Sequence, residues 1–203
     1  MKIISVCIFC SSLVFSGLAT AQDTITLLDG KVLEVEVVNS DSTAVTYNLK
    51  KRNKTIQKTI SSELIFMIQY AQQKTDTIYF LSENNDHYLS VHEMQLFIYG
   101  EQDAKKYYKP TLTTVFGVAF GATFGYILRD GFYVASVPLV YTVAAGVSTV
   151  KVKFNDERNT QIMSHPAYQE GYIKVARSKK AFNALGSSLV GTVLGIFIGN
   201  ATN

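Results

Sequence analysis

Apolar and polar residues follow two different patterns along the chain. From Asp23 to Leu81 they alternate in short runs separated by polar turns, which is the two-residue period of half-buried β-strands. From Thr111 onwards, long uncharged apolar runs with regularly spaced glycines replace this alternation. We therefore predict an α+β chain, β-rich first and helical afterwards, with the boundary in the polar segment from Ser82 to Tyr108.

The first part, residues 22–82, is predicted to be a small β domain. Asp29-Gly30 is a strong signal for a tight hairpin, and residues 61–64 are predicted to form a single helical turn before a late strand. Five short strands in about 60 residues, with this turn near the end, favour a small SH3-like β-barrel or a rolled antiparallel sheet. The strand-like runs are residues 23–28, 32–37, 44–49, 55–60 and 65–70, and a last strand over 77–81 completes the sheet.

The second part follows a polar connector over residues 83–110 and begins with an apolar helical hairpin over residues 111–150. Its first run, Thr111–Leu128, has 18 uncharged residues, about 27 Å as a helix, which is just enough to cross a bilayer core. Its second run, Phe132–Val150, is also uncharged, but Pro138 and many β-branched residues leave its helical state open. The last uncharged run is predicted to form a C-terminal apolar helix over residues 184–203.

Glycines four residues apart recur in the first and last of these runs. On a helix this spacing makes a smooth stripe, which lets another backbone approach closely. Each glycine costs a helix in water about 1 kcal/mol relative to alanine, and close helix packing in a bilayer offsets that cost. We therefore predict helix packing, within the chain or between copies, at Gly117, Gly121, Gly125, Gly191, Gly195 and Gly199.

A basic polar segment, residues 151–183, separates the hairpin from the C-terminal helix. Ser164-His165-Pro166 is predicted to begin a helix here, with serine as the cap and proline in the first turn. One interpretation of its basic cluster is a site for anionic lipid headgroups, and the alternative is a solubilising turn beside an apolar helix. Both interpretations put the segment at the edge of a membrane. The cluster consists of Lys174, Arg177, Lys179 and Lys180.

The N-terminus has the pattern of an export signal. Residues 1–21 combine a basic start, an apolar stretch and the small residues Ala19-Thr-Ala21, so cleavage is expected before Gln22; an uncleaved anchor is the alternative. Cleavage would remove Cys7 and Cys10, which excludes a cysteine nucleophile, a disulfide and a cysteine-bound zinc from the mature chain. We therefore expect an exported protein of the inner or outer envelope membrane, with its β domain on the periplasmic side.

Candidate catalytic chemistry is sparse. Metal-ligand types cluster around His87 and His92, but their spacing does not place both imidazoles on one helix face; the acidic members are Glu83 and Asp86. No serine-hydrolase, zinc-protease or nucleotide-binding motif occurs. Without Lys2 the 19 basic residues become 18, against 16 acidic ones, and this balance disfavours a nucleic-acid partner. We predict no enzyme, no cofactor and no metal.

Two parts of the chain resemble exported, uncharacterised envelope proteins of Bacteroidota-type bacteria. In the β domain the similarity rests on Leu28–Val32, Val45–Tyr47 and Ser62–Tyr70. Near the C-terminus it rests on Tyr168, Gly171, Tyr172, Ala176, Lys179, Lys180, Gly186, Gly191 and Gly195. The apolar hairpin also resembles the glycine-zipper hairpins of bacterial envelope proteins. The resemblance implies export and a membrane location, and no particular activity.

These patterns predict a non-enzymatic envelope protein whose β head is tethered by packed or oligomerising glycine-zipper helices. Its expected partners are membrane lipid and either a second copy or an envelope protein. The alternative is a soluble secreted binding module whose apolar half docks on a partner protein. Cleaved export followed by three spans would leave the basic segment outside the cytoplasm, against the positive-inside preference. An outer-membrane location, or residues 132–150 lying on the membrane, would remove this conflict.

Overall fold

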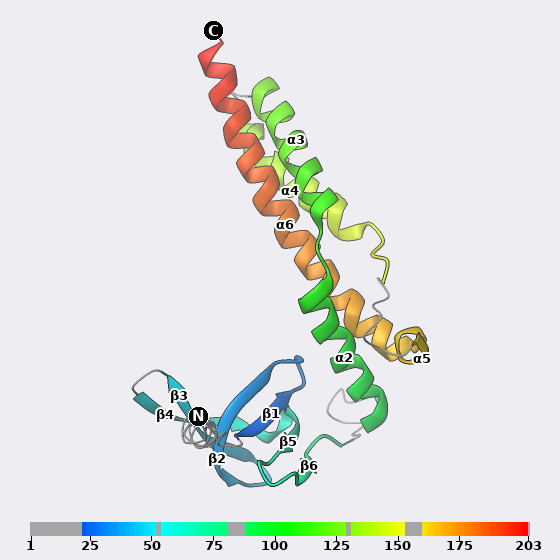
Figure 1. Cartoon of the computed structure of the whole chain (residues 1–203). Coiled ribbons are helices and arrows are strands. Elements are labelled where there is room, and N and C mark those ends of the chain that lie inside the picture. The colour runs from blue at the N-terminus through cyan, green and yellow to red at the C-terminus, as the bar shows by residue number, and fades with distance from the viewer. Residues whose placement is uncertain (1–21, 52–53, 81–87, 129–130, 153–159, 203) are drawn as a thin grey trace, which may run out of the picture. The chain divides into compact units, whose positions relative to one another are not determined.

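The structure is a computed structural model that describes residues 22–51, 54–80, 88–128, 131–152 and 160–202 (Figure 1). The chain divides into two units: residues up to 27 together with 32–79 form the first, and residues 28–31 together with 80–203 form the second. The first holds a six-stranded antiparallel sheet and the second holds a long C-terminal apolar helix, so the predicted α+β class is confirmed. The predicted signal peptide, residues 1–21, lies outside the described residues.

The sheet of the first unit is open. Its strands lie in the order β4-β3-β2-β1-β5-β6, and every neighbouring pair is antiparallel. Within the part of the chain that the structure describes, no pairing joins β4 to β6. Of the two predicted alternatives, a closed SH3-like barrel is therefore not formed there, and the antiparallel sheet of the other alternative is present. The strands are β1 Asp23–Leu27, β2 Val32–Ser40, β3 Ala44–Lys51, β4 Lys54–Ser61, β5 Ile65–Gln69 and β6 Thr75–Thr77.

One face of the sheet carries the core of the first unit. Ile25, Val45 and Ile68 are fully buried there and pack in one cluster with Val35 and Ile65. Most of these positions follow the alternation in the sequence, because every second residue of a strand points to the same face. Ile65 and Ile68 are three residues apart, and the register of the β1–β5 pair shifts between them. The helical turn predicted before the late strand is present as the short 3₁₀ helix η1, which covers residues 62–64.

The last strand begins earlier than predicted. A tight turn follows β5, closed by hydrogen bonds from Tyr70 N–H to Lys74 O (2.8 Å) and from Gln73 N–H to Tyr70 O (3.0 Å). Gln73 adopts a positive φ of 64° in this turn. Because the chain reverses at once, β6 covers residues 75–77 instead of residues 77–81.

The segment predicted to be a polar connector contains a helix, α2, Val91–Tyr107. A capping box begins it: Glu93 N–H donates to Ser90 Oγ (3.3 Å), and Ser90 N–H donates to Glu93 Oε2 (2.9 Å). Hydrogen bonds from Ser90 lower the pKa of the Glu93 carboxyl. The prediction missed this helix because two of its acidic residues, Glu101 and Asp103, are buried, the reverse of what their charge suggests.

The other helices follow the apolar runs. The second run is helical, as a 3₁₀ turn and a short α-helix, which answers the question that the sequence left open. The basic segment and the C-terminal run, predicted as separate elements, share one continuous helix of 36 residues. Its cap is His165 and not Ser164, since His165 Nδ1 accepts from Ala167 N–H (3.3 Å). The helices are α3 Thr111–Ile127, η2 Phe132–Ser136, α4 Val137–Val147, α5 Thr160–Ser164 and α6 Pro166–Ala201.

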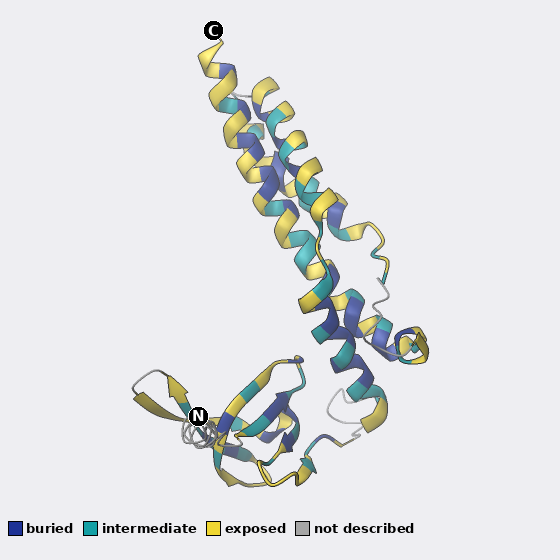
Figure 2. Cartoon of the chain, viewed as in Figure 1, coloured by how far each residue is buried: buried dark blue, intermediate teal, exposed yellow. Residues whose placement is uncertain are grey.

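The first half of α6 packs against α2 and the second half against α3 and α4 (Figure 1). Tyr168 and Tyr172 of α6 lie in the buried core of the first crossing. Figure 2 shows buried stretches on both helices there. The two backbones touch there, because a Cβ added at Gly100 would lie 2.1 Å from Tyr168 O and one added at Gly171 would lie 2.1 Å from Phe97 O. Helix α3 continues from α2 after a bend of 56°.

Candidate functional site

Helices α3 and α6 are in backbone contact along two facing rows of glycine. A Cβ added at Gly121 would lie 2.2 Å from Ser188 O, and one added at Gly195 would lie 2.2 Å from Ala122 O. Residue numbers rise together along the two helices, so the helices run parallel. The six glycines predicted to pack helices are all buried: Gly117, Gly121 and Gly125 on α3, and Gly191, Gly195 and Gly199 on α6. The structure thus pairs the two stripes within one chain.

Three small hydroxyl residues of α6 share this contact, and the sequence prediction did not identify them. Ser187, Ser188 and Thr192 are buried. Ser188 Oγ donates to Ala184 O (2.6 Å), and Thr192 Oγ1 donates to Ser188 O (2.8 Å). Each hydroxyl donates to a carbonyl of its own helix, so these buried donors are hydrogen-bonded without water. A run of small residues between the spaced glycines was the signal that could have identified them.

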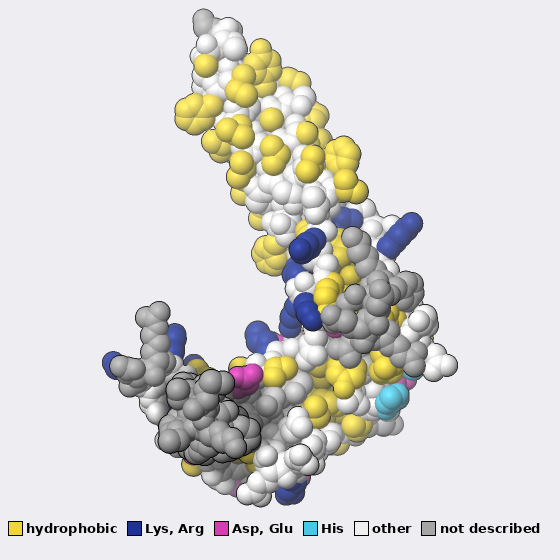
Figure 3. Space-filling view, viewed as in Figure 1, with side chains coloured by type: hydrophobic (Ala, Val, Ile, Leu, Met, Phe, Trp, Pro, Cys, Tyr) yellow, Lys and Arg dark blue, Asp and Glu magenta, His cyan; other side chains and the backbone are white. Residues whose placement is uncertain are grey.

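The outer surface of α3, α4 and the second half of α6 is made of large apolar side chains. Phe116 is 63% exposed and Phe197 is 72% exposed, while the six glycines of the two stripes lie inside. Figure 3 shows apolar side chains over this part of the visible face, with lysine and arginine only at its lower end. A helical unit folded in water has the reverse arrangement. The exposed apolar residues include Leu112, Val115, Ile127, Leu139, Val140, Val143, Leu189, Val190, Val193, Leu194 and Ile198.

One described helix, α6, is long and apolar enough by length and composition to cross a membrane. Helices α2 and α3 pass the same test only when taken together as a bent pair. The segment Phe132–Val147, which contains η2 and α4, is apolar but shorter.

Two lysines of the predicted headgroup cluster contact helix ends. Lys179 Nζ donates to Lys105 O (2.6 Å) and to Ala104 O (3.2 Å), which are among the last carbonyls of α2. Lys180 Nζ donates to Ser148 Oγ and, at 3.4 Å, to Ser148 O just beyond α4. Because the last carbonyls of a helix have no partner within it, these consecutive lysines stabilise the ends of two different helices.

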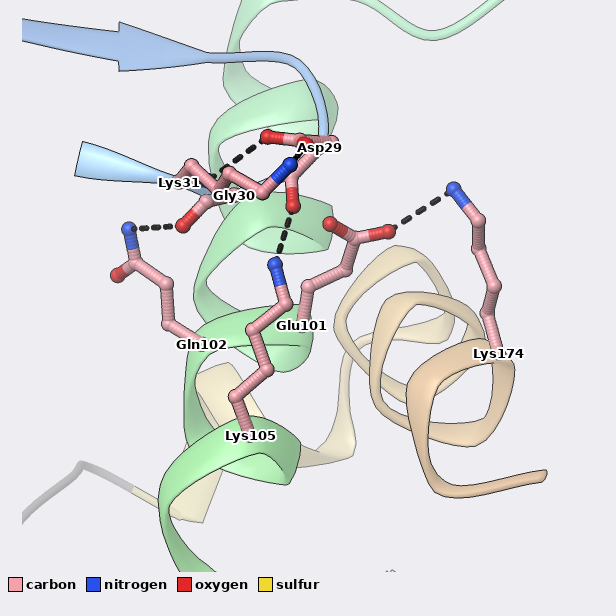
Figure 4. Close-up of polar contacts among 7 residues, drawn as sticks. All are labelled: Asp29, Gly30, Lys31, Glu101, Gln102, Lys105 and Lys174. Atoms are coloured by element: carbon pink, nitrogen blue, oxygen red, sulfur yellow. Dashed lines mark hydrogen bonds and ion pairs between the residues drawn. The ribbon is translucent and has the colours of Figure 1, made fainter. Parts of the chain in front are cut away.

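The other two residues of the cluster differ from one another. Lys174 Nζ lies 2.9 Å from Glu101 Oε1 (Figure 4). It also lies 5.0 Å from the centre of the Phe97 ring. The Glu101 side chain is 2% exposed, and its Oε2 has no hydrogen-bond partner in the described part of the chain. Arg177 is exposed, and no hydrogen bond or ion pair joins it to another described residue. Of the four predicted residues, it alone makes no polar contact with the described part of the chain.

The turn around Gly30, which belongs to the second unit, lies against α2 beside Glu101 (Figure 4). Lys105 Nζ donates to Asp29 O, and Gln102 Nε2 donates to Gly30 O (3.4 Å). Lys31 bonds the Asp29 carboxylate through its N–H (3.0 Å) and its Nζ (2.7 Å). Burial raises the pKa of Asp29, but the bonds from Lys31 outweigh it and the pKa is lowered. These polar groups satisfy one another, which indicates a structural contact.

The histidines form no metal centre among the described residues. His92 and His165 meet edge to face, with ring centres 6.4 Å apart. His87 and its acidic neighbours Glu83 and Asp86 lie outside the described residues. In the ranges that the structure describes, no three histidine, cysteine, aspartate or glutamate side chains are grouped so that they could hold a metal ion.

No protein-family model, curated protein or solved structure matches this chain. The resemblance to exported envelope proteins therefore stays a prediction. Function has to be inferred from the arrangement of the residues themselves.

Proposed function

We propose that α3, η2, α4 and the second half of α6 form a membrane-embedded anchor, and that the protein is a non-enzymatic component of a bacterial envelope. One observation carries this proposal: the glycines and small hydroxyl residues of the α3–α6 contact lie inside the helical unit, and large apolar side chains lie outside. Lipid solvates such a surface at no cost, whereas close backbone packing through small residues replaces the hydrophobic effect inside a bilayer. The anchor would hold the β unit at the membrane.

The dimensions support the proposal. Helix α3 has 17 residues and rises about 25 Å, and residues 181–201 of α6 rise about 31 Å, against a hydrocarbon core of about 30 Å. Tyrosines flank the apolar surface as interfacial anchors do. Tyr107 and Tyr108 precede α3, and Tyr126 and Tyr133 lie near its far end.

The anchor is proposed to be a glycine zipper that closes on itself. Because Gly121 and Gly191 face the opposite helix of the same chain, their surfaces are occupied without a second copy. Self-association through these stripes, one of the sequence-based expectations, would require the α3–α6 contact to open. We therefore propose membrane lipid as the main partner of this unit.

Alkaline carbonate extraction tests the anchor. We expect the full chain to stay in the membrane pellet, and Val193→Lys to weaken its insertion, because a lysine at the centre of a spanning helix costs about 2.5–3.5 kcal/mol. Val193 is 51% exposed on the outer face of α6. The matched control is Ser178→Lys, at an exposed position among the basic residues, which should be retained like the parent chain. Release of the parent chain into the wash would support the soluble module that docks on a partner.

A second experiment tests the orientation. Lys179 bonds Tyr108 O and Lys180 bonds Ser148 O, so the start of α3, the end of α4 and the basic turn of α6 lie at one end of the apolar surface. No apolar run separates this end from the β unit in the sequence, so both should lie on the same side of the membrane.

With the exported β unit proposed here, that side is the periplasm. In a chain without Cys7 and Cys10, Arg177→Cys should react with a membrane-impermeant maleimide from the periplasm, and Thr202→Cys at the end of α6 should not. The opposite labelling would place the basic end in the cytoplasm, as the positive-inside preference has it, and would argue against export of the β unit.

A further inference from the structure

An apolar groove of about 600 Å³ lies between α3 and α4. It exists because both helices pack mainly on α6 and touch one another at few points. One such point is the hydrogen bond from Tyr141 OH to Thr113 O (2.7 Å), and another is the stacking of the Phe120 and Tyr141 rings at 5.3 Å. The lining includes Phe116, Phe120 and Phe124 of α3, Tyr141 and Ala144 of α4, and Lys180 of α6.

The shape of the groove favours a flexible chain over another helix. Phe116, Phe120 and Phe124 recur every four residues, so their rings form one row along α3. A second helix would need small residues at this place to bring its backbone close. The glycines of α3 already face α6, and their surfaces are occupied. An acyl chain has no such requirement, because it bends to follow the rings.

The positive charge at one end of the groove indicates that the acyl chain belongs to a lipid with an anionic headgroup. Among the described residues that line the groove, only Lys180 is charged. Its Nζ contacts Ser148 Oγ, Ser148 O (3.4 Å) and Thr149 O (3.5 Å), and no carboxylate of a described residue pairs with it. The adjacent Lys179 bonds Tyr108 O before α3 begins, so Lys180 lies at the end of the groove where the apolar surface stops. A phosphate at this level would supply the missing negative charge.

We propose that the α3–α4 groove binds one acyl chain of an anionic membrane phospholipid, whose phosphate pairs with Lys180. The proposal rests on the membrane anchor described above and adds a specific lipid site to it. The lipid would fill the space between α3 and α4 and so complete the packing of the anchor.

Photolabelling of the full chain in vesicles tests this site. The vesicles are made of phosphatidylcholine with a minor fraction of phosphatidylglycerol, and the photoreactive group is in the acyl chain of one lipid or the other. Labelling should concentrate on Thr123 and Ala144, which line the groove, over Val143 and Val193, which face outward. The phosphatidylglycerol probe should label the groove more than the phosphatidylcholine probe does.

Two pairs of variants and one rescue variant separate binding of the acyl chain from the effect of the Lys180 charge. Ala119→Phe fills the groove and should remove its labelling by both probes, whereas Val143→Phe, outside the lining, should leave it unchanged. Lys180→Met should lower phosphatidylglycerol labelling about fivefold and leave phosphatidylcholine labelling nearly as it was. Arg177→Met removes the same charge away from the groove and should change neither. Lys180→Arg should restore the preference for phosphatidylglycerol. This result would show that the effect of Lys180→Met comes from the lost charge and not from misfolding.

The outcomes distinguish failure of the site from failure of the anchor. Uniform labelling around the three helices would overturn the site and leave the anchor standing, because lipid would then be only a solvent. Cross-links from groove residues to a second chain would overturn it in favour of a dimer. Absence of labelling on every face, with release of the chain by carbonate, would overturn both the site and the anchor.

Discussion

Gly121→Ala and Gly195→Ala should each destabilise the full chain, although alanine is the better helix former. A Cβ at either position would lie 2.2 Å from a backbone oxygen of the opposite helix, that of Ser188 or that of Ala122. Backbone cannot turn away as a side chain can, so the helices must separate. Overpacking costs about 1–3 kcal/mol, which exceeds the gain of about 1 kcal/mol in helix propensity. Denaturant unfolding in detergent micelles, followed by circular dichroism, measures the difference.

Two glycines outside the contact provide the matched controls. Nothing lies within 4 Å of a Cβ added at Gly146 or at Gly186. Alanine at these positions should be neutral or stabilise the chain by up to about 1 kcal/mol. Val193→Leu adds volume on the outer face and should also be mild. Equal effects for all four glycine variants would show that α3 and α6 do not pack through their stripes.

The same series also tests where the stripes pack. Because the contact lies within one chain, the loss should appear in the unfolding of the single chain at any protein concentration. A zipper between copies would instead make the loss depend on concentration and change the assembled state. Light scattering of the variants in micelles separates these results.

Local patterns predicted the elements whose determinants lie close together in the sequence. The Asp29-Gly30 turn, the strands beside it and helix α3 each follow from a few neighbouring residues, and the structure has them near the expected positions. Residues 132–147 were ambiguous because β-branched side chains suit both strands and membrane helices. The strand β6 was misplaced because a tight turn at Gln73 carries no glycine to announce it.

Contacts between distant residues were beyond the sequence prediction. Glycine spacing predicts that a stripe packs, but it does not say that Gly121 meets residues about 70 positions later. Likewise, Lys179 and Lys180 lie in a basic cluster of the kind that binds lipid headgroups, yet each donates a hydrogen bond to the end of another helix. Helix α2 was missed because burial of Glu101 becomes intelligible only when Lys174 is placed beside it. The role of each of these residues depends on a residue far away in the sequence, and only the folded structure shows which residue that is.

Lys174→Met should destabilise the α2–α6 crossing. It leaves the Glu101 carboxylate, whose side chain is 2% exposed, without the ammonium that lies 2.9 Å from Oε1. Oε2 already lacks a hydrogen-bond partner among the described residues, so the buried charge would lose its main compensation. Breaking a fully buried pair costs about 3–5 kcal/mol. Because the Lys174 side chain is 62% exposed, water replaces part of the interaction, and we expect about 1–3 kcal/mol.

A double-mutant cycle identifies the cause of this loss. Methionine keeps an unbranched apolar stem, but it also removes the ammonium that lies 5.0 Å from the centre of the Phe97 ring, so this cation–π contact is lost together with the ion pair. Glu101→Gln removes the charge that Lys174 compensates, and it should therefore recover part of the stability lost in Lys174→Met. Arg177→Met, on the same helix and without a partner in the described chain, should stay within about 0.5 kcal/mol of the parent. If Lys174→Met were as mild as Arg177→Met, or if Glu101→Gln added a full loss of its own, the buried carboxylate would not depend on the ion pair.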